Sequence, residues 1–387
     1  MLCSPKGGIS LGIHLFEPKF NRTECIKQIE ECLDKGWTGL GYKTIDFEEE
    51  WKKYTGFHNA IFLNSCTSAL ILAVDGLKSK YGWDASSEII TTPNTFVSTN
   101  HAILKNGLKP IFADIDDTLC LSPKSVEEKI SKNTCAIMFV GIGGNASNYP
   151  AIVELCKKYE LKLILDAAHM AGTRINGEIV GKEADAVCYS FHSVKNLCTA
   201  DAGMLCFRDD ILDKEARKKS WMGIDKNTFE RAEKSGYSWE YDIQYLGEKY
   251  HGNSIMAAIA LAQLPQLDEG NTRRREIAQM YTSHFLQFPK DIKMIRISDI
   301  CDSSFHLYQI LVENRDGLID FMKNRDIDCG VHYIANTRYQ IYSYAEKTCS
   351  FAEYVSDHIV SLPMHLRLSD EDVMYVADTV IEYVTKR

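Results

Sequence analysis

The sequence has no long uninterrupted apolar run, no excess of basic residues and no close pair of cysteines. A run of about 18 apolar residues would be needed to span a bilayer, and the first residues, MLCSPKGGISLGIH, lack the apolar core of a signal peptide. The formal net charge of −9 argues against a broad nucleic-acid footprint. We therefore expect a cytoplasmic protein whose partners are small anions, with neither nucleic acid nor membrane among them.

The cysteines are numerous but scattered, and the sequence holds no C-x-x-C, no H-E-x-x-H and no acidic calcium loop. Most of the 13 cysteines lie in apolar runs, where a thiol behaves as a small hydrophobe, so we expect neither a disulfide framework nor a metal site. At 387 residues, 45% of them hydrophobic, the chain exceeds the size at which a single core stops growing. This length predicts two domains.

The stretch from 161 to 207 carries the most chemistry. An apolar run, Leu161–Leu165, ends in Asp166, and a second short strand, Ala186–Tyr189, ends in Ser190, with Lys195 in the polar turn that follows. Buried parallel strands deliver such side chains to the carboxyl edge of a sheet, where ligands bind in open α/β folds. A lysine can form a Schiff base with an aldehyde, and an acid can keep a pyridine nitrogen protonated. The pair therefore suits a cofactor with both groups.

Two other positions have a functional and a structural interpretation. The strand Ala60–Leu63 runs through NSCTSAL, which includes Thr67 and Ser68, into a helical pattern, and free N–H groups at a helix start can cradle a phosphate. Serine and threonine are also ordinary N-caps, so both interpretations stay open here. Phe96, near the start of the helix predicted for 95–106, could stack on a flat cofactor ring or simply belong to the core.

Strands and helices alternate through the first two thirds of the chain. Strands are predicted at Glu88–Thr91, Lys109–Ala113 and Cys135–Val140, and the helix Tyr149–Lys158 crosses back to the strand before Asp166. This alternation predicts an α/β fold with a mostly parallel sheet and helices on both faces. The GIGG run that follows Val140 is too loose to be a dinucleotide-binding fingerprint.

The character changes after position 207. Residues 208–250 form a charged, aromatic segment, for which we predict a lid or a subunit-contact arm. A long helix over 271–287 then leads to a smaller α+β unit, with strands predicted at Phe305–Val312 and Cys329–Tyr333 and helices at Arg315–Lys323 and 369–385.

Many short motifs in a fixed order make the chain resemble the DegT/DnrJ/StrS-type nucleotide-sugar aminotransferases, a branch of the type I pyridoxal-phosphate fold. They are GWTGLG, NSCTSAL, TTPNTFVSTNHAIL, PIFADID, LDAAH, SFHSVKN, YDIQYLGEKYHGNSIMAAIALAQL, HLYQI, VHY and SLPMH. The resemblance implies a large cofactor-binding domain over 15–268, a small C-terminal domain over 269–387 and an N-terminal arm over 1–14. It also implies pyridoxal 5'-phosphate as cofactor and a homodimer with shared active sites.

The resemblance also implies roles for single residues. Lys195 matches the catalytic lysine that binds the cofactor aldehyde and moves the proton, and Asp166 matches the partner of the pyridine nitrogen. His169 matches the position beside the ring's phenolic oxygen, and Lys249 the position from which the neighbouring subunit reaches the cofactor phosphate. Phe96 matches the aromatic residue that stacks on the ring. The remaining matches are phosphate ligands, namely Thr67, Ser68 and Ser190.

The reaction that this family implies is the transfer of an amino group, from L-glutamate, to the keto group of a nucleotide-linked deoxyhexose. Two alternatives stay open: a keto-cyclitol or other small ketone as acceptor, and a non-catalytic regulatory relative. Three departures from the family pattern leave the substrate open. They are GIGG at 141–144 in place of His-Leu-Tyr-Gly, Ala200-Asp201-Ala202-Gly203 in place of Gly-Glu-Gly-Gly, and no proline after VHY at 331–333.

Overall fold

A seven-stranded sheet forms the centre of the computed structural model, which describes residues 12–225 and 240–386. In spatial order the strands are β1 (Ile61–Leu63), β9 (Gly203–Phe207), β8 (Ala186–Ser190), β5 (Lys162–Asp166), β4 (Thr134–Val140), β2 (Glu88–Thr91) and β3 (Lys109–Phe112). The pairs from β8 to β3 are parallel, and β9 runs antiparallel to both β8 and β1. The prediction of a mostly parallel sheet is confirmed.

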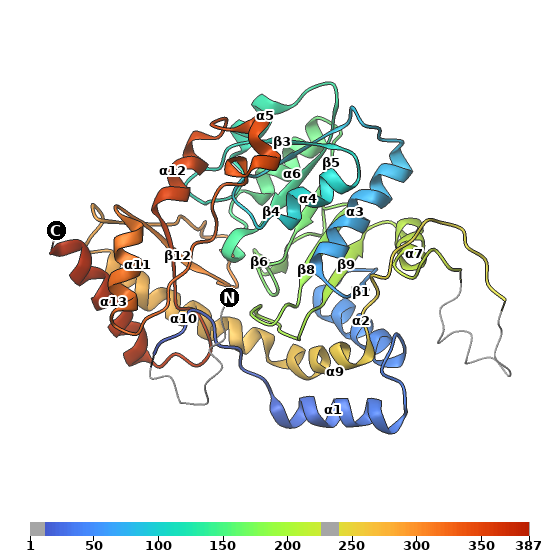
Figure 1. Cartoon of the computed structure of the whole chain (residues 1–387), viewed down its shortest axis with the longest axis horizontal. Helices are drawn as coiled ribbons and strands as arrows, with labels where there is room; N and C mark the ends of the chain where they lie inside the picture. Colours follow the sequence, from blue (N-terminus) through green and yellow to red (C-terminus); the bar gives the residue numbers. More distant parts are fainter. Residues whose placement is uncertain (1–11, 226–239, 387) are drawn as a thin grey trace.

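Helices cover both faces of this sheet, because its strands are apolar on both sides (Figure 1). Along β4, Ala136 and Met138 belong to one core while Ile137 and Phe139 belong to the other. The first core packs against α3 (Cys66–Tyr81), α4 (Ser98–Lys105) and α7 (Asp210–Lys219). The second packs against α2 (Tyr42–Thr55), α5 (Pro123–Lys129), α6 (Tyr149–Lys158) and α9 (Ser254–Gln263), and α1 (Arg22–Asp34) lies along α9.

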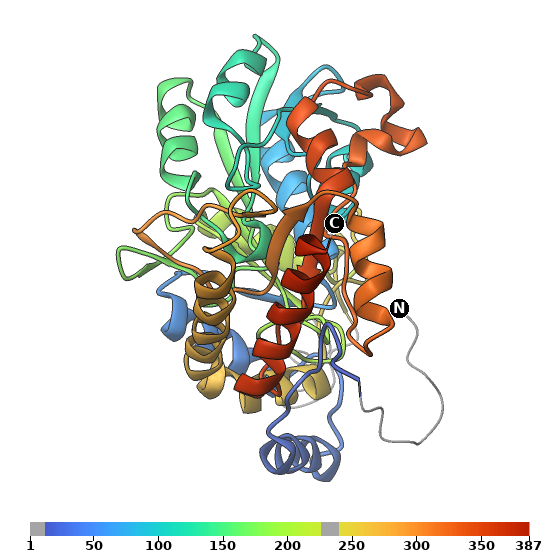
Figure 2. The same ribbon diagram turned by 90° about the vertical axis from the view of Figure 1, so that its left-hand side faces the viewer.

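The C-terminal part has a smaller antiparallel sheet of β10 (Ile292–Met294), β12 (Tyr308–Val312) and β13 (Ile359–Leu362) (Figure 2). Its core is shared with α10 (Leu267–Phe285), α11 (Arg315–Lys323) and α13 (Asp370–Thr385). A third sheet joins β11 (Cys301–Asp302) to β6 (Arg174–Ile175) and β7 (Glu178–Ile179). The short 3-10 helices are η1 (Ile142–Gly144), η2 (Leu264–Gln266), η3 (Asn336–Arg338) and η4 (Gln340–Ala345).

The C-terminal part also contributes to the core of the large sheet. Tyr342 of η4 and Val355 of α12 (Ser350–His358) pack in the same cluster as Phe47 and Phe139. The predicted division at 268/269 therefore stays a prediction. Residues 1–11 of the predicted arm and residues 226–239 of the charged segment lie outside the described residues.

One predicted strand is wrong. Within Cys329–Tyr333 only Gly330 makes a bridge, to Ser361, and the chain then leaves the sheet so that His332 and Tyr333 can line a cavity. The strands that pair with β12 are β10 and β13, which the sequence did not indicate. The charged segment after position 207 begins with a regular helix, α7.

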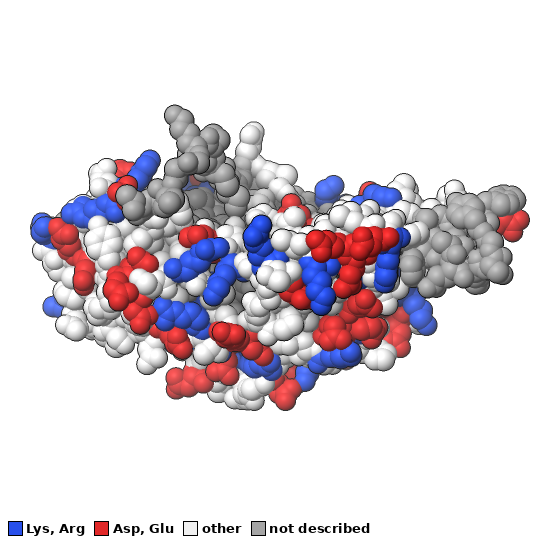
Figure 3. Space-filling model, turned by 90° about the horizontal axis from the view of Figure 1, so that it is seen from below, with Lys and Arg blue, Asp and Glu red and all other residues white. Residues whose placement is uncertain are grey.

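Three further features of the described residues are surface charge, helix length and the state of the cysteines. The face seen in Figure 3 carries lysine and arginine side chains interspersed with aspartate and glutamate. Within the described residues, each helix is too short or too polar to cross a bilayer. The cysteines of those residues are free thiols, all buried except Cys135 and Cys329, which are partly exposed.

Gly203 sets how closely β9 approaches the start of α3. A Cβ at this position would lie 2.4 Å from the carbonyl carbon of Ser65 and 2.5 Å from the backbone nitrogen of Cys66. Because Gly203 pairs with Ser190 in the β8–β9 ladder, this contact brings the end of β8 and the N-terminus of α3 to the same edge of the sheet.

We predict that Gly203→Ala lowers the free energy of unfolding by about 1–3 kcal/mol, because backbone atoms of Ser65 and Cys66 must move to admit the methyl group. The matched control is Gly39→Ala, where a Cβ would meet nothing within 4 Å. Urea unfolding of both variants measures the difference. Equal stability of the two variants would contradict the close approach.

Candidate active site

A cavity of about 490 Å³ opens at the carboxyl edge of the large sheet. Predicted site residues from four separate segments line it: Thr67, Phe96, Asp166, His169, Ser190 and Lys195. The lining does not include Ser68 or Lys249. The structure therefore brings together the residues that sequence reasoning placed on different strand ends.

Asp166 ends β5 and is buried at the floor of the cavity. Its carboxylate accepts a 2.7 Å hydrogen bond from the Thr99 hydroxyl and a 3.0 Å hydrogen bond from the backbone N–H of Ala168. Burial raises the pKa of Asp166, while these two donors and the charge of Lys195 act to lower the pKa. A buried carboxylate held in this way is suited to a cationic partner such as a protonated pyridine nitrogen.

Lys195 lies in the turn between β8 and β9, with its Nζ 3.3 Å from His306 Nε2. Burial lowers the pKa of Lys195 to about 8, and the acidic groups of Cys66 and Asp166 oppose that shift. A lysine with such a pKa is partly neutral near neutral pH, and the neutral amine is the nucleophile that attacks an aldehyde.

His169 is held by the GIGG segment. Its Nδ1 accepts a 3.1 Å hydrogen bond from the backbone N–H of Gly143, so the neutral ring carries its hydrogen on Nε2, which lies 3.4 Å from the Tyr333 hydroxyl. Burial, together with the charges of Lys195 and His332, holds the pKa of His169 well below its usual range. The ring is therefore a neutral donor toward the cavity.

The glycines of this segment fit closely against their neighbours. A Cβ at Gly141 would lie 2.0 Å from Met170 Sδ, and Gly143 has a φ of +63°. A side chain at Gly141 would force Met170 to move, and a side chain at Gly143 would strain the backbone that holds His169. The glycines at 141 and 143 are thus used for close packing and for a positive φ.

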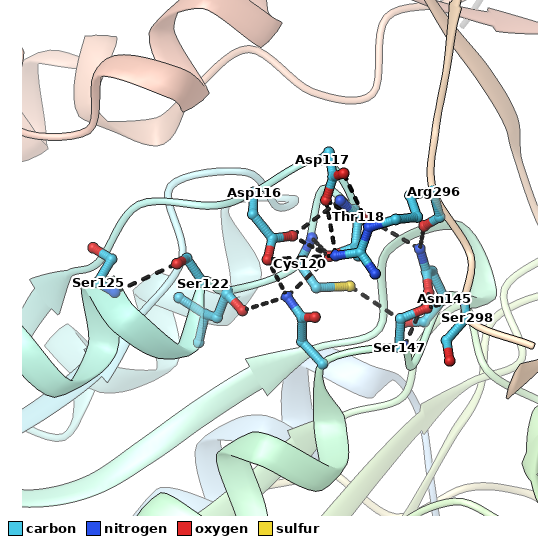
Figure 4. A network of polar contacts seen from close by, with 12 residues as sticks. Asp116, Asp117, Thr118, Cys120, Ser122, Ser125, Asn145, Ser147, Arg296 and Ser298 are labelled. Carbon is cyan, nitrogen blue, oxygen red and sulfur yellow. Dashed lines mark hydrogen bonds and ion pairs between the residues drawn. The ribbon is translucent and has the colours of Figure 1, made fainter. Parts of the chain in front are cut away.

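The loop that continues from GIGG is fixed by a polar network (Figure 4). The side-chain amide of Asn145 donates to the carbonyl oxygens of Thr118 and Arg296, at 3.0 and 2.9 Å. Arg296 Nε in turn lies 2.9 Å from both carboxylate oxygens of Asp117. These contacts connect the loop at Asn145, which continues from the segment that holds His169, to the segment before β11.

The N-terminus of α3 faces the cavity through Ser65, Cys66 and Thr67. Ser65 caps this helix by accepting a 3.1 Å hydrogen bond from the N–H of Ser68, and the Ser68 hydroxyl donates to Asn64 at 2.6 Å. Free N–H groups and the helix dipole favour an anion at this end. Ser68 could bind that anion through its hydroxyl only after leaving Asn64, so its role stays a prediction.

Phe96 and Lys249 are both exposed. Phe96 lines the cavity, with its ring 6.2 Å from that of Tyr333. Lys249 lies elsewhere, with its Nζ 3.6 Å from the centroid of the Trp221 ring. Stacking by Phe96 and phosphate contact by Lys249 both remain predictions.

Sequence reasoning missed several side chains of the site. Thr99 lies one helical turn after Thr95 and donates a hydrogen bond to Asp166. His306 and Tyr333 belong to the HLYQI and VHY motifs and line the cavity, but no periodic pattern in the sequence reveals these contacts. The order of the motifs was their only signal.

A lysine of lowered pKa and a buried carboxylate, both at the carboxyl edge of a mostly parallel sheet, define a type I pyridoxal-phosphate enzyme. The chain belongs to the DegT/DnrJ/EryC1/StrS aminotransferase family, whose profile matches residues 20–381. It is therefore a pyridoxal-phosphate-dependent aminotransferase.

Three relatives illustrate the similarity. The spore coat polysaccharide biosynthesis protein SpsC of Bacillus subtilis is 34% identical over 373 residues, which cover 93% of each chain. PseC of Helicobacter pylori, an aminotransferase of pseudoaminic acid biosynthesis, superposes with a TM-score of 0.88 at 28% identity, covering 97% of this chain and 100% of PseC. The PLP form of the putative sugar aminotransferase Spr1654 of Streptococcus pneumoniae also gives 0.88, at 26% identity, covering 97% and 99%.

We predict that Thr99→Val destabilises the protein by about 1–3 kcal/mol, because the buried Asp166 carboxylate loses a donor. Since burial raises the pKa of Asp166, the folded state holds that proton more tightly than the unfolded chain, and ionisation costs stability as pH rises through the folded pKa. The loss in Thr99→Val should therefore be larger at pH 8, where the carboxylate is ionised, than at a pH below the folded pKa of Asp166.

The control is Thr91→Val, which removes a buried hydrogen bond of the same length to the neutral amide of Asn100. Its cost should not depend on pH. Denaturant unfolding at both pH values measures the two variants, and a pH-independent loss in Thr99→Val would contradict the assigned contact with an ionised Asp166.

Proposed function

We propose that this aminotransferase transfers an amino group from L-glutamate to the keto group of a nucleotide-linked deoxyhexose, with pyridoxal 5'-phosphate as cofactor. The observation that carries the proposal is the pair of Asp166 and Lys195 in one cavity, each with a pKa moved by burial. The names of the relatives support a sugar acceptor, because they refer to a sugar aminotransferase and to polysaccharide and pseudoaminic acid biosynthesis.

The donor groups of the cavity fit this cofactor. Asp166 would hold the ring nitrogen, His169 would donate from Nε2 to the phenolic oxygen, and Phe96 would cover one face of the ring. The phosphate would bind at the N-terminus of α3, with contacts from Thr67, Ser68 and Ser190. When bound, the cofactor supplies an electron sink for the charge that develops at the substrate carbon.

Lys195 is the residue that moves the proton. Its pKa of about 8 lies close to neutral pH, so both the amine and the ammonium are populated, and the same group can take a proton from one carbon and return it to another. Asp166 would supply the negative charge for the ring nitrogen, and the two hydrogen bonds that it accepts keep the carboxylate from rotating.

We predict that Lys195→Ala lowers the rate of amino transfer by about 10³-fold or more, because the group that moves the proton is lost. Lys157→Ala, which removes an exposed lysine on α6, should keep the wild-type rate. Formation of 2-oxoglutarate from glutamate under single-turnover conditions provides the measurement. Normal turnover in Lys195→Ala would disprove the mechanism.

The substrate class is tested by a screen of acceptors. The enzyme is first converted to its amine form with L-glutamate, and candidate keto-sugar nucleotides and free keto-cyclitols are then compared by recovery of the visible cofactor absorbance. We expect recovery only with keto-sugar nucleotides. Recovery with keto-cyclitols alone would favour the alternative acceptor, and the absence of any cofactor absorbance would favour a non-catalytic relative.

We further propose a homodimer in which Lys249 contacts the cofactor phosphate in the partner's cavity. Its exposed position outside the cavity of its own chain supports this arrangement. The alternative is an ordinary surface lysine, whose removal would leave cofactor affinity unchanged. A cytoplasmic location and the division into domains at 268/269 are proposed on the sequence alone.

Subunit mixing tests the shared site. Lys195→Ala and Lys249→Ala should each be impaired alone, but a refolded equal mixture should regain about a quarter of the wild-type activity, because half of the dimers are hybrids with one intact site. Activity and cofactor affinity after mixing provide the readout. No recovery on mixing would contradict a site built from two chains.

A further inference from the structure

Two asparagines determine which nitrogen of His306 carries the hydrogen. The side-chain amide of Asn271 donates to the carbonyl oxygen of Ala171 at 2.9 Å, which leaves its Oδ1 free to accept from Asn196 Nδ2 at 2.8 Å. Asn196 Nδ2 also donates to the carbonyl oxygen of Ser304 at 2.8 Å. Because a carbonyl oxygen can only accept, the orientation of both amides follows from their partners.

The orientation of Asn196 fixes His306 in turn. Asn196 Oδ1 lies 3.1 Å from His306 Nδ1, and an amide oxygen can only accept, so Nδ1 carries the hydrogen. His306 is buried, and burial together with nearby positive charge holds its pKa well below its usual range, so the ring is neutral. The lone pair is then on Nε2, which faces Lys195 Nζ at 3.3 Å.

Two further contacts hold the ring in place. Phe16 stacks on His306, with the centroids 5.6 Å apart and an interplanar angle of 7°. The ring of His169 lies 4.4 Å from that of His306 and has the opposite tautomer, because its Nδ1 accepts from Gly143. A Cβ at Gly172 would lie 2.3 Å from Asn271 Nδ2, so the absence of a side chain at Gly172 leaves room for the Asn271 amide.

We propose that His306 is a positioning residue whose Nε2 lone pair accepts a hydrogen bond from Lys195 Nζ, in a tautomer set by Asn196 and Asn271. The inference rests on the proposed function, in which Lys195 carries the proton. When the Lys195 amine is neutral, one N–H is directed to His306 and its single lone pair points away from that ring. When Lys195 is protonated, His306 Nε2 remains a fixed acceptor for the ammonium group. The substrate proton thus moves to and from a lysine whose geometry is set in advance.

Among the described residues, His306 is the side chain within hydrogen-bond distance of Lys195 Nζ. The other titratable groups that act on Lys195 or His306 are Cys66, Asp166, His169, Arg274 and His332. The Asp166 oxygens are engaged by Thr99 and Ala168, and His332 Nδ1 lies 2.9 Å from the Ser361 hydroxyl. His169 presents a hydrogen rather than a lone pair on Nε2.

The tautomer is tested directly by long-range ¹H–¹⁵N correlation spectra of the full chain labelled with [¹⁵N]histidine. His306, assigned by the loss of its signals in His306→Phe, should carry hydrogen on Nδ1 alone between pH 6 and 8, while His169 should carry hydrogen on Nε2. Asn196→Ala should remove the preference at His306. A protonated ring, or hydrogen on Nε2 of His306 in the wild type, would overturn the proposal.

The effect on Lys195 is tested by competitive labelling of the cofactor-free chain with trace acetic anhydride. His306→Phe keeps an aromatic ring but has no acceptor, so the ammonium loses stabilisation and labelling of Lys195 at pH 7 should rise roughly threefold or more. His306→Gln, whose amide oxygen can accept, should restore most of the wild-type value. Exposed lysines in the same digest serve as internal controls.

Equal labelling of Lys195 in wild type and His306→Phe would contradict the proposed contact. If His306→Phe does not fold, as thermal melting would reveal, the loss of signals in His306→Gln assigns His306, and the spectra of the wild type and of Asn196→Ala still decide. Cofactor binding is measured separately. A wild-type chain that binds no pyridoxal phosphate would disprove the proposed function while leaving the tautomer result standing.

Discussion

Burial of opposite charges in one cavity is the constraint on which the site depends. Removal from water raises the pKa of Asp166 and lowers that of Lys195, so each group is pushed toward its neutral form. Fixed hydrogen-bond partners stabilise the charged forms: Thr99 and Ala168 donate to the carboxylate, and His306 accepts from the lysine. The result is a carboxylate suited to a cationic ring and an amine that can both attack and carry a proton.

The backbone makes this arrangement possible by close approach at a few glycines. Gly203 lets β9 contact the start of α3, so that the end of β8 and a helix N-terminus meet at one edge. Gly141 and Gly143 let the loop after β4 pack on Met170 and hold His169 through a backbone N–H. The polar network around Asn145 and Arg296 fixes that loop from behind (Figure 4). Side-chain chemistry and backbone packing thus act on the same few residues.

Much of the fold could be predicted from the sequence, because apolar runs that end in polar residues mark buried strands. The strands that end near Asp166 and Ser190 were located within a residue, whereas 329–333 was mistaken for a strand because its apolar pattern reflects cavity lining and a single bridge to Ser361. Of the site, Asp166 and Lys195 follow from the residue types alone. Thr99, His306 and Asn196 could not, because their contacts join residues 67 to 111 positions apart and depend on side-chain orientation.

Lys195 and Asp166 together would form the binding site of one aldehyde cofactor. The most direct measurement is to incubate the chain with pyridoxal 5'-phosphate, reduce with borohydride and identify the modified residue by peptide mass spectrometry. We expect a stable cofactor adduct on Lys195, and a much weaker yield when Asp166 is replaced by alanine. An unmodified Lys195, or modification confined to exposed lysines such as Lys249, would contradict a shared cofactor site.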